Sequence, residues 1–142
     1  MKKIFLSLAV IFLTATTFAQ KITDKNVPAS VKNAFLQKYP TATSVKWDKE
    51  TPNYEASFDL NKIDNSVLID AKGNIIETEV EISMSKIPKN AKAYITKNYA
   101  GKKVTEAAQI TNAKGIITYE VEIKGMDIIF DSNGNFIKEI KA

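Results

Sequence analysis

The chain of 142 residues contains no cysteine, no histidine and no arginine. Without cysteine it has no disulfide, no thiol nucleophile and no thiolate metal site. Without histidine it lacks the commonest general base and the commonest metal ligand. All 20 basic residues are lysine, so the planar guanidinium that binds phosphate and carboxylate bidentately is also missing. These absences exclude the enzyme classes that depend on cysteine or histidine, and they leave packing alone to stabilise the fold.

The N-terminal residues have the pattern of a secretory signal peptide. Lys2 and Lys3 form a positive n-region, an apolar run covers 4–13, and small residues precede a cleavage site after Ala19. A membrane anchor is the alternative, but the run is shorter than the roughly 20 residues of a spanning helix. We therefore expect residues 1–19 to be removed. The mature chain, 20–142, is then exported to the periplasm or secreted, and it has no transmembrane segment.

The charge of the mature chain is modest. Removal of Lys2 and Lys3 leaves 18 lysines against 16 acidic residues, a net charge of +2. No basic stripe is interleaved with aromatic residues, so the sequence gives no indication of nucleic-acid binding. It predicts no cofactor, and it leaves the oligomeric state open.

The chain repeats itself at a spacing of about 60 residues. Pro28 and Tyr39 recur as Pro88 and Tyr99, each 60 residues later. The segment Asp-x-x-Gly-Asn occurs at 70–74 and again at 131–135, 61 residues later. A repeat of this kind indicates one supersecondary unit built twice.

Each repeat reads as one helix followed by four antiparallel strands. Apolar residues at helical spacing predict helices over 28–39 and 88–99. Alternating apolar and polar residues predict eight strands, at 45–47, 54–58, 67–69, 76–82, 104–110, 119–123, 126–130 and 136–140.

The predicted fold class is α+β: a tandem repeat, about 24–82 and about 86–142, whose helices cover one face of an eight-stranded antiparallel sheet. Two copies of about 60 residues are each marginal alone, so we expect one shared core. The other face of the sheet is expected to be solvated. Thr78 and Val80 align with Glu139 and Lys141, so the last strand is expected to change phase or to end early.

Two polar patterns have alternative interpretations. The twin Asp-x-x-Gly-Asn segments resemble calcium loops, but they have too few oxygen ligands, and hairpin turns are favoured over a metal site. Glu77, Glu79 and Glu81 share one strand face, where like charges could raise pKa values for acid/base catalysis. A solvated sheet face is the favoured interpretation, and we assign no catalytic residue. Trp47, in phase with Val45, is predicted to lie in the core.

Leu68 and Ile129 occupy the same position in the two repeats and are predicted to point away from the helices. Two apolar side chains on an otherwise charged, open face could form a binding patch. Scattered exposed apolar residues are the alternative.

The sequence resembles the PepSY-like family of exported bacterial proteins, which is also described as β-lactamase-inhibitor-like. The resemblance begins with Val27-Pro-x-x-Val31 and continues through Lys38-Tyr39-Pro40 to Trp47. It extends through 54–58, 70–74 and 119–122, and so covers essentially the whole mature chain. It implies a tandem α+β repeat, and export in Gram-negative bacteria of the Bacteroidetes type. Inhibition of a β-lactamase is implied only by analogy of fold.

Three functions remain open at this point. The first is a non-enzymatic, exported binding or inhibitory module whose open sheet face engages a protein or peptide of the cell envelope. The second is a structural or chaperone-like envelope protein without a specific ligand. The third is a hydrolase that uses the carboxylates of residues 77–81. For the first, the predicted side of the sheet selects the candidate binding residues Glu55, Leu68, Glu120, Glu122 and Ile129.

Overall fold

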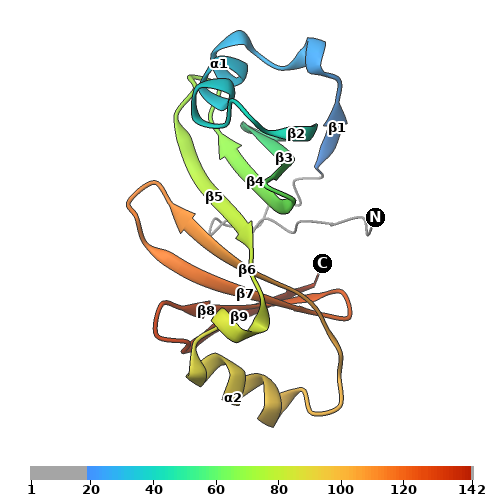
Figure 1. Ribbon diagram of the computed structural model, residues 1–142, viewed down its shortest axis with the longest axis vertical. Helices are drawn as coiled ribbons and strands as arrows, with labels where there is room; N and C mark the ends of the chain where they lie inside the picture. Colours follow the sequence, from blue (N-terminus) through green and yellow to red (C-terminus); the bar gives the residue numbers. More distant parts are fainter. Residues whose placement is uncertain (1–18, 142) are drawn as a thin grey trace. The chain divides into compact units, whose positions relative to one another are not determined.

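The computed structural model describes residues 19–141, which form nine β-strands and two α-helices (Figure 1). They divide into two compact units. The N-terminal unit holds the described residues up to 80 together with 112–114, and the C-terminal unit holds 81–111 and 115–141. The expected signal peptide lies outside the described residues, except for Ala19.

The strands of the N-terminal unit are antiparallel neighbours in chain order. A short 3-10 helix, Asp24–Asn26, leads into the α-helix, which covers one face of the strands (Figure 1). The elements are β1 (Gln20–Ile22), α1 (Ala29–Lys38), β2 (Thr43–Glu50), β3 (Asn53–Leu60), β4 (Ile63–Ile69) and β5 (Ile75–Glu81).

The C-terminal unit repeats this order. A 3-10 helix, Met84–Lys86, precedes the α-helix, and four antiparallel strands follow. The elements are α2 (Lys89–Asn98), β6 (Val104–Asn112), β7 (Ile117–Ile123), β8 (Met126–Asp131) and β9 (Phe136–Lys141). Nine strands are found instead of the expected eight, because β1 pairs along β2 before the first helix.

Both α-helices bury the face that the sequence predicts. In α1, Val31 and Phe35 are buried, and in α2 Ala91 and Ile95 are buried. Each helix begins directly after a proline, a residue that loses nothing at a helix start because its missing N–H would have no partner there. The helix predictions are confirmed.

The expectation of one shared core is wrong, because each unit has a core of its own. In the N-terminal unit, Phe35 contacts Trp47 and Phe58 edge to face, with ring centroids 5.3 and 5.0 Å apart. The prediction for Trp47 is confirmed. Val45 is exposed, because a bulge between Thr43 and Lys46 breaks its phase with Trp47.

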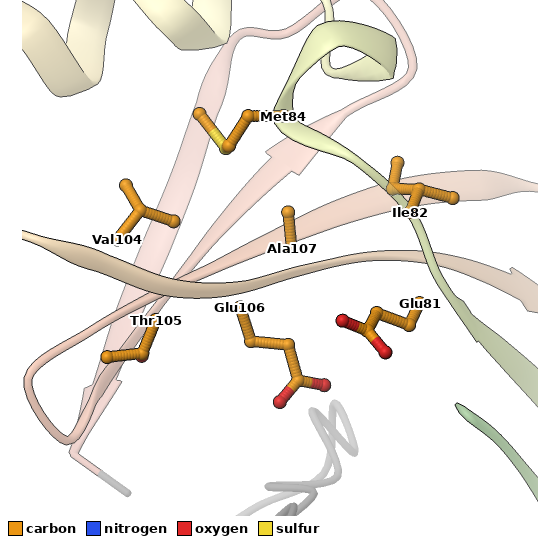
Figure 2. A pocket seen from close by; sticks show the side chains of 7 residues that line it. All are labelled: Glu81, Ile82, Met84, Val104, Thr105, Glu106 and Ala107. Carbon is orange, nitrogen blue, oxygen red and sulfur yellow. The ribbon is translucent and has the colours of Figure 1, made fainter. Parts of the chain in front are cut away.

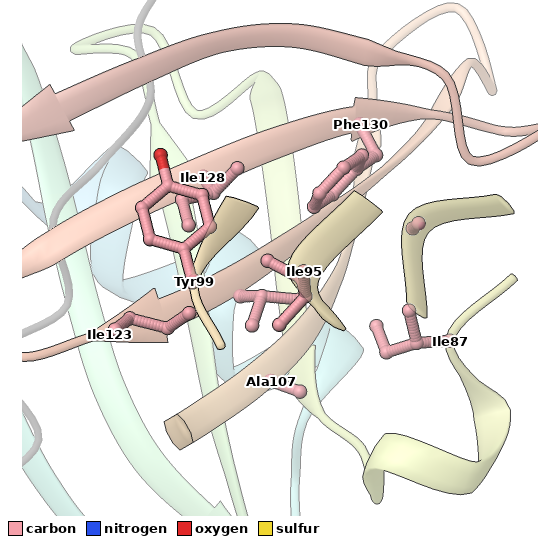
Figure 3. Packing of buried hydrophobic residues seen from close by; sticks show 9 residues of the cluster. Ile87, Ile95, Tyr99, Ala107, Ile123, Ile128 and Phe130 are labelled. Carbon is pink, nitrogen blue, oxygen red and sulfur yellow. The ribbon is translucent and has the colours of Figure 1, made fainter. Parts of the chain in front are cut away.

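The core of the C-terminal unit lies between α2 and strands β6 to β8 (Figure 3). It is built mainly from aliphatic side chains, with Phe130 fully buried. The labelled members in Figure 3 are Ile87, Ile95, Tyr99, Ala107, Ile123, Ile128 and Phe130.

The final strand, β9, pairs with β8 in the same register in which β5 pairs with β4. Glu77 pairs with Leu68 in the N-terminal unit, and Lys138 pairs with Ile129 in the C-terminal unit. Both pairs precede a register shift at the same place, between residues 68 and 69 and between 129 and 130. The expectation that the last strand changes phase or ends early is therefore wrong, because its charged residues occupy the positions of Thr78 and Val80 without disturbing the ladder.

Candidate functional site: the helix-distal faces

The side of each unit's strands that points away from its helix is called here the helix-distal face. Directly opposed residues of antiparallel strands share a face, so the strand registers define its members. In the N-terminal unit they include Asp48, Glu50, Glu55, Ser66, Leu68, Glu77 and Glu79. In the C-terminal unit they include Ala108, Ile110, Glu120, Glu122, Asp127, Ile129 and Lys138.

The strands bring the predicted binding residues together in two equivalent pairs. Glu55 of β3 lies directly opposite Leu68 of β4, and Glu120 of β7 lies directly opposite Ile129 of β8. Glu122 lies two residues further along β7, on the same face, opposite Asp127.

Four of these five side chains are buried, although the sequence predicted them on an exposed face. Glu55 is 3% exposed, Leu68 2%, Glu120 6% and Ile129 3%, while Glu122 is half-buried. The expectation that Leu68 and Ile129 are exposed on a solvated face is therefore wrong. Alternation fixes the side of a strand on which a residue lies, but it does not reveal whether that side is covered.

Glu55 is surrounded by other carboxylates. Asp48 lies directly opposite it on β2, Glu50 lies two residues along β2 on the same face, and Glu77 lies beyond Leu68 on β5. Burial, together with the charges of Glu50, Asp48 and Glu77, raises the pKa of Glu55 to about 8. A hydrogen bond with the Ser66 hydroxyl opposes this shift. Glu55 is thus largely protonated at neutral pH.

The pKa of the neighbouring Glu50 is also raised. Burial raises its pKa, and the charge of Asp48 adds to the shift. Asp48 and Glu50 are not among the binding residues predicted from the sequence. Their alternation with Lys49 along β2 is visible in the sequence, but their approach to Glu55 depends on the pairing of β2 with β3.

The carboxylates considered for catalysis do not form one group. Glu77 and Glu79 lie on the helix-distal face, whereas Glu81 is exposed at the end of β5. Glu81 lines a shallow depression of about 190 Å³ in the C-terminal unit. Figure 2 shows its carboxylate beside that of Glu106 on one side of β6, with Met84, Val104 and Ala107 on the other. The strand thus separates the acidic from the apolar lining.

The twin Asp-x-x-Gly-Asn segments are hairpin turns, as predicted. Asp70 accepts hydrogen bonds from the backbone N–H groups of Lys72 and Asn74, each at 2.9 Å, and from the Asn74 side chain. Asp131 makes the equivalent bonds with Asn133 and Asn135. The side-chain bond from the asparagine is the main reason that the pKa of each aspartate is lowered.

Across residues 19–141, no cluster of three or more acidic residues has a geometry that could hold a metal ion. In the same residues, no helix is both long enough and apolar enough to span a membrane.

Comparison with known proteins gives one family and a set of solved structures. The family described as "Putative beta-lactamase-inhibitor-like, PepSY-like" matches twice, over residues 15–77 and 67–138. The first match falls within the N-terminal unit, and the second begins in that unit and extends over most of the C-terminal unit. No curated protein matches the chain.

Three solved structures, all from Bacteroides, share the fold. One of the "putative periplasmic proteins" of B. eggerthii is 17% identical, with a TM-score of 0.73 over 81% of this chain and 88% of that one. A DUF2874 family protein of B. uniformis is 24% identical, with a TM-score of 0.70 over 80% and 88%. A BLIP-like protein of B. fragilis is 22% identical, with a TM-score of 0.62 over 81% and 86%. Identities this low establish the fold and nothing further.

Proposed function

Because the chain belongs to the PepSY-like, beta-lactamase-inhibitor-like family, we propose that it is an exported, non-enzymatic module that binds a protein or peptide of the cell envelope. The binding surface is the part of the helix-distal face that remains accessible, which includes Asp48, Glu50 and Glu122. Export is supported by the signal-peptide pattern at 1–19 and by the periplasmic description of the B. eggerthii structure.

One observation supports this function above all. Both units bury a glutamate at the same place on the helix-distal face, Glu55 opposite Leu68 and Glu120 opposite Ile129. The hydrophobic cores lie on the other face, so these carboxyl groups add nothing to them. Burying an ionisable group costs stability, and such groups gather at functional sites. Glu122, which is half-buried, is the predicted site residue that a partner would contact most directly.

Site-specific photo-cross-linking in the producing cell tests this proposal. A photoreactive phenylalanine analogue replaces Asp48 or Glu122 on the helix-distal faces. In the controls it replaces Leu36 of α1, which is 58% exposed, or Lys97 of α2, which is also exposed. We expect an adduct of one discrete mass from the helix-distal positions and none from the helix positions. Adducts that form only from the helices overturn the proposal. A ladder of many masses from all positions points to the chaperone-like alternative instead.

Inhibition is the form of binding that the family description suggests. It is tested by hydrolysis of a chromogenic cephalosporin by a purified β-lactamase in the presence of increasing amounts of the chain. A saturable fall in the initial rate, reduced by Glu122→Lys but not by Lys97→Glu, supports inhibition through the helix-distal face. An unchanged rate removes this enzyme as a target and leaves the cross-linking result to decide on binding.

A further inference from the structure

We infer that Asp48 and Glu50, backed by Glu55, form a docking site for an extended segment of an exported protein that carries lysine or arginine at alternate positions. This inference rests on the proposed function and specifies its partner chemistry. The site lies wholly within the N-terminal unit, on β2 and β3.

The spacing of the two β2 carboxylates suits such a segment. Asp48 and Glu50 are two residues apart on one strand, so their side chains leave the same face about 7 Å apart. Alternate side chains of an extended partner chain leave its backbone at the same spacing. Two cationic side chains of the partner can therefore meet the two carboxylates at the same time. Both carboxylates are half-buried and thus remain partly accessible to a partner.

Glu55 provides an independent indication that a cation belongs here. Its side chain is 97% buried, its register directs it toward the face that holds Asp48 and Glu50, and its Oε1 atom accepts no hydrogen bond. A buried carboxyl oxygen without a donor is costly, and a nearby cationic donor removes part of that cost. Burial and the charges of Glu50, Asp48 and Glu77 raise the pKa of Glu55, and a cation close to this group of carboxylates would oppose that shift.

Two lysines lie on this face in the part of the chain that the structure describes. Lys21 is directly opposite Asp48 and Lys46 is directly opposite Ser57, and both side chains are exposed. Across 19–141, no lysine forms a salt bridge with Asp48, Glu50 or Glu55. The expected mature chain as a whole is weakly basic, with 18 lysines against 16 acidic residues and a net charge of +2. The acidic site is therefore a local feature that attracts cationic partners selectively.

A direct binding measurement tests the inference. The probe is a fluorescein-labelled peptide in which lysine and serine alternate. Its binding to the purified chain is measured by fluorescence anisotropy. The double variant Asp48→Asn/Glu50→Gln should weaken binding about tenfold, or about 1.4 kcal/mol. The control Glu81→Gln/Glu139→Gln removes the same charge from exposed positions of the C-terminal unit and should change binding less than twofold. Added salt should weaken wild-type binding, because the attraction is electrostatic.

Three outcomes overturn the inference: equal loss in both double variants, equal binding of a glutamate–serine peptide, or displacement of the lysine peptide by equimolar calcium chloride. The inference is also overturned if the wild-type chain sediments as a dimer and the Asp48→Asn/Glu50→Gln variant sediments as a monomer. The lysines of a second copy would then be the ligand. If the lysine peptide fails to bind while cross-links still form from the helix-distal positions, the partner chemistry is wrong and the proposed function stands.

Discussion

The two units use the same strand registers but place different side chains on their helix-distal faces. Around Glu55, the N-terminal unit has Asp48 directly opposite and Glu50 nearby. Around Glu120, the C-terminal unit has Ala108 directly opposite and Ile110 nearby, and both are buried. Glu55 therefore has an acid directly across on the neighbouring strand, while Glu120 has aliphatic side chains across on β6 and the acids Glu122 and Asp127 further along β7 and β8.

The outer strands differ in the same way. On β5, Glu77 lies directly opposite Leu68 in the N-terminal unit. On β9, Lys138 lies directly opposite Ile129 in the C-terminal unit. Glu55 and Glu120 have equivalent strand neighbours on both sides, so the difference around them lies in the side chains. The fold thus tolerates either set of side chains. Both helix-distal faces carry acids, and the N-terminal unit differs in placing them directly across from its buried glutamate.

The largest expected effect is the pH dependence that Glu55 gives to the stability of the fold. Its pKa is about 8 in the folded chain, against an ordinary 4.5. Between these values the folded chain binds more protons than the unfolded chain, so the free energy of unfolding falls as pH rises. The stabilising contribution is complete below pH 4.5 and is lost through pH 8, a change on the order of 4 kcal/mol. Glu55→Gln should remove most of this decline in urea unfolding between pH 5 and 9.

The control for this measurement is Glu81→Gln, which alters an exposed carboxylate at the end of β5. It should keep the wild-type slope of stability against pH. If Glu55→Gln also keeps that slope, Glu55 is not the titrating group, and the contrast between the acidic neighbours of Glu55 and the aliphatic neighbours of Glu120 has no effect on stability.

A smaller effect is expected at the hairpin turns that pack under the helices. A Cβ atom at Gly134 would lie 2.7 Å from the backbone nitrogen of Ala91 and 2.8 Å from the Cβ of Pro88. At Gly125 it would meet nothing within 4 Å, although φ is positive at both glycines. We expect Gly134→Ala to lower the free energy of unfolding by about 3 kcal/mol and Gly125→Ala by about 1 kcal/mol.

Gly73 supplies the comparison between the units. Its Cβ would lie 2.9 Å from the carbonyl oxygen of Ser30, a single close contact where Gly134 has two. Gly73→Ala should therefore rank between the other two variants in thermal or urea unfolding. Equal losses at Gly73, Gly125 and Gly134 would mean that the backbone conformation, and not the docking of the turn under the helix, determines the cost.

Much of this architecture could be predicted from the sequence, because it depends on local patterns. Helical spacing around Phe35 and Ile95, strand alternation and the two aspartate turns each require only a few neighbouring residues. The equivalence of Glu55 and Glu120 was harder to see, since these residues are 65 apart and not 60. The loop before β7 is longer than its counterpart before β3, which hides that part of the repeat.

The acidic site depends on information that is not local. Asp48 and Glu55 belong to different strands, and only the register of β2 against β3 makes them neighbours. Burial of Leu68 and Ile129 is a property of the folded chain, so alternation could not predict it. The separate cores are also a tertiary result, because chain length indicates how much surface can be buried but not how the buried residues are divided.

Introducing an acid into the C-terminal unit should reproduce part of the difference between the faces. Ala108 is 1% exposed and lies opposite Glu120, as Asp48 lies opposite Glu55. We expect Ala108→Asp to be less stable than the isosteric, uncharged Ala108→Asn by about 2 kcal/mol at pH 8, because a charge is then buried beside a carboxyl group. The difference should shrink at pH 4, where carboxyl groups take up protons. A difference that does not change with pH would assign the loss to shape and not to charge.

The smallest expected effect comes from a contact that only the C-terminal unit makes. The Tyr99 hydroxyl donates a hydrogen bond of 2.5 Å to the carboxylate of Glu139, and this bond is the main reason that the pKa of Tyr99 is raised to about 12. Glu139 occupies the place of Thr78, so the N-terminal unit cannot form the equivalent bond from Tyr39.

Tyr99→Phe should therefore lower the free energy of unfolding at pH 7 by about 1 kcal/mol or less, since the Glu139 side chain is exposed and water can replace part of the bond. Tyr39→Phe should change it little, because its ring packs against Phe35 and Phe58 through faces that phenylalanine retains. If the two variants lose equal stability, the hydroxyl–carboxylate bond contributes nothing measurable. The charged residues of β9 would then be tolerated at an edge strand and would not stabilise it.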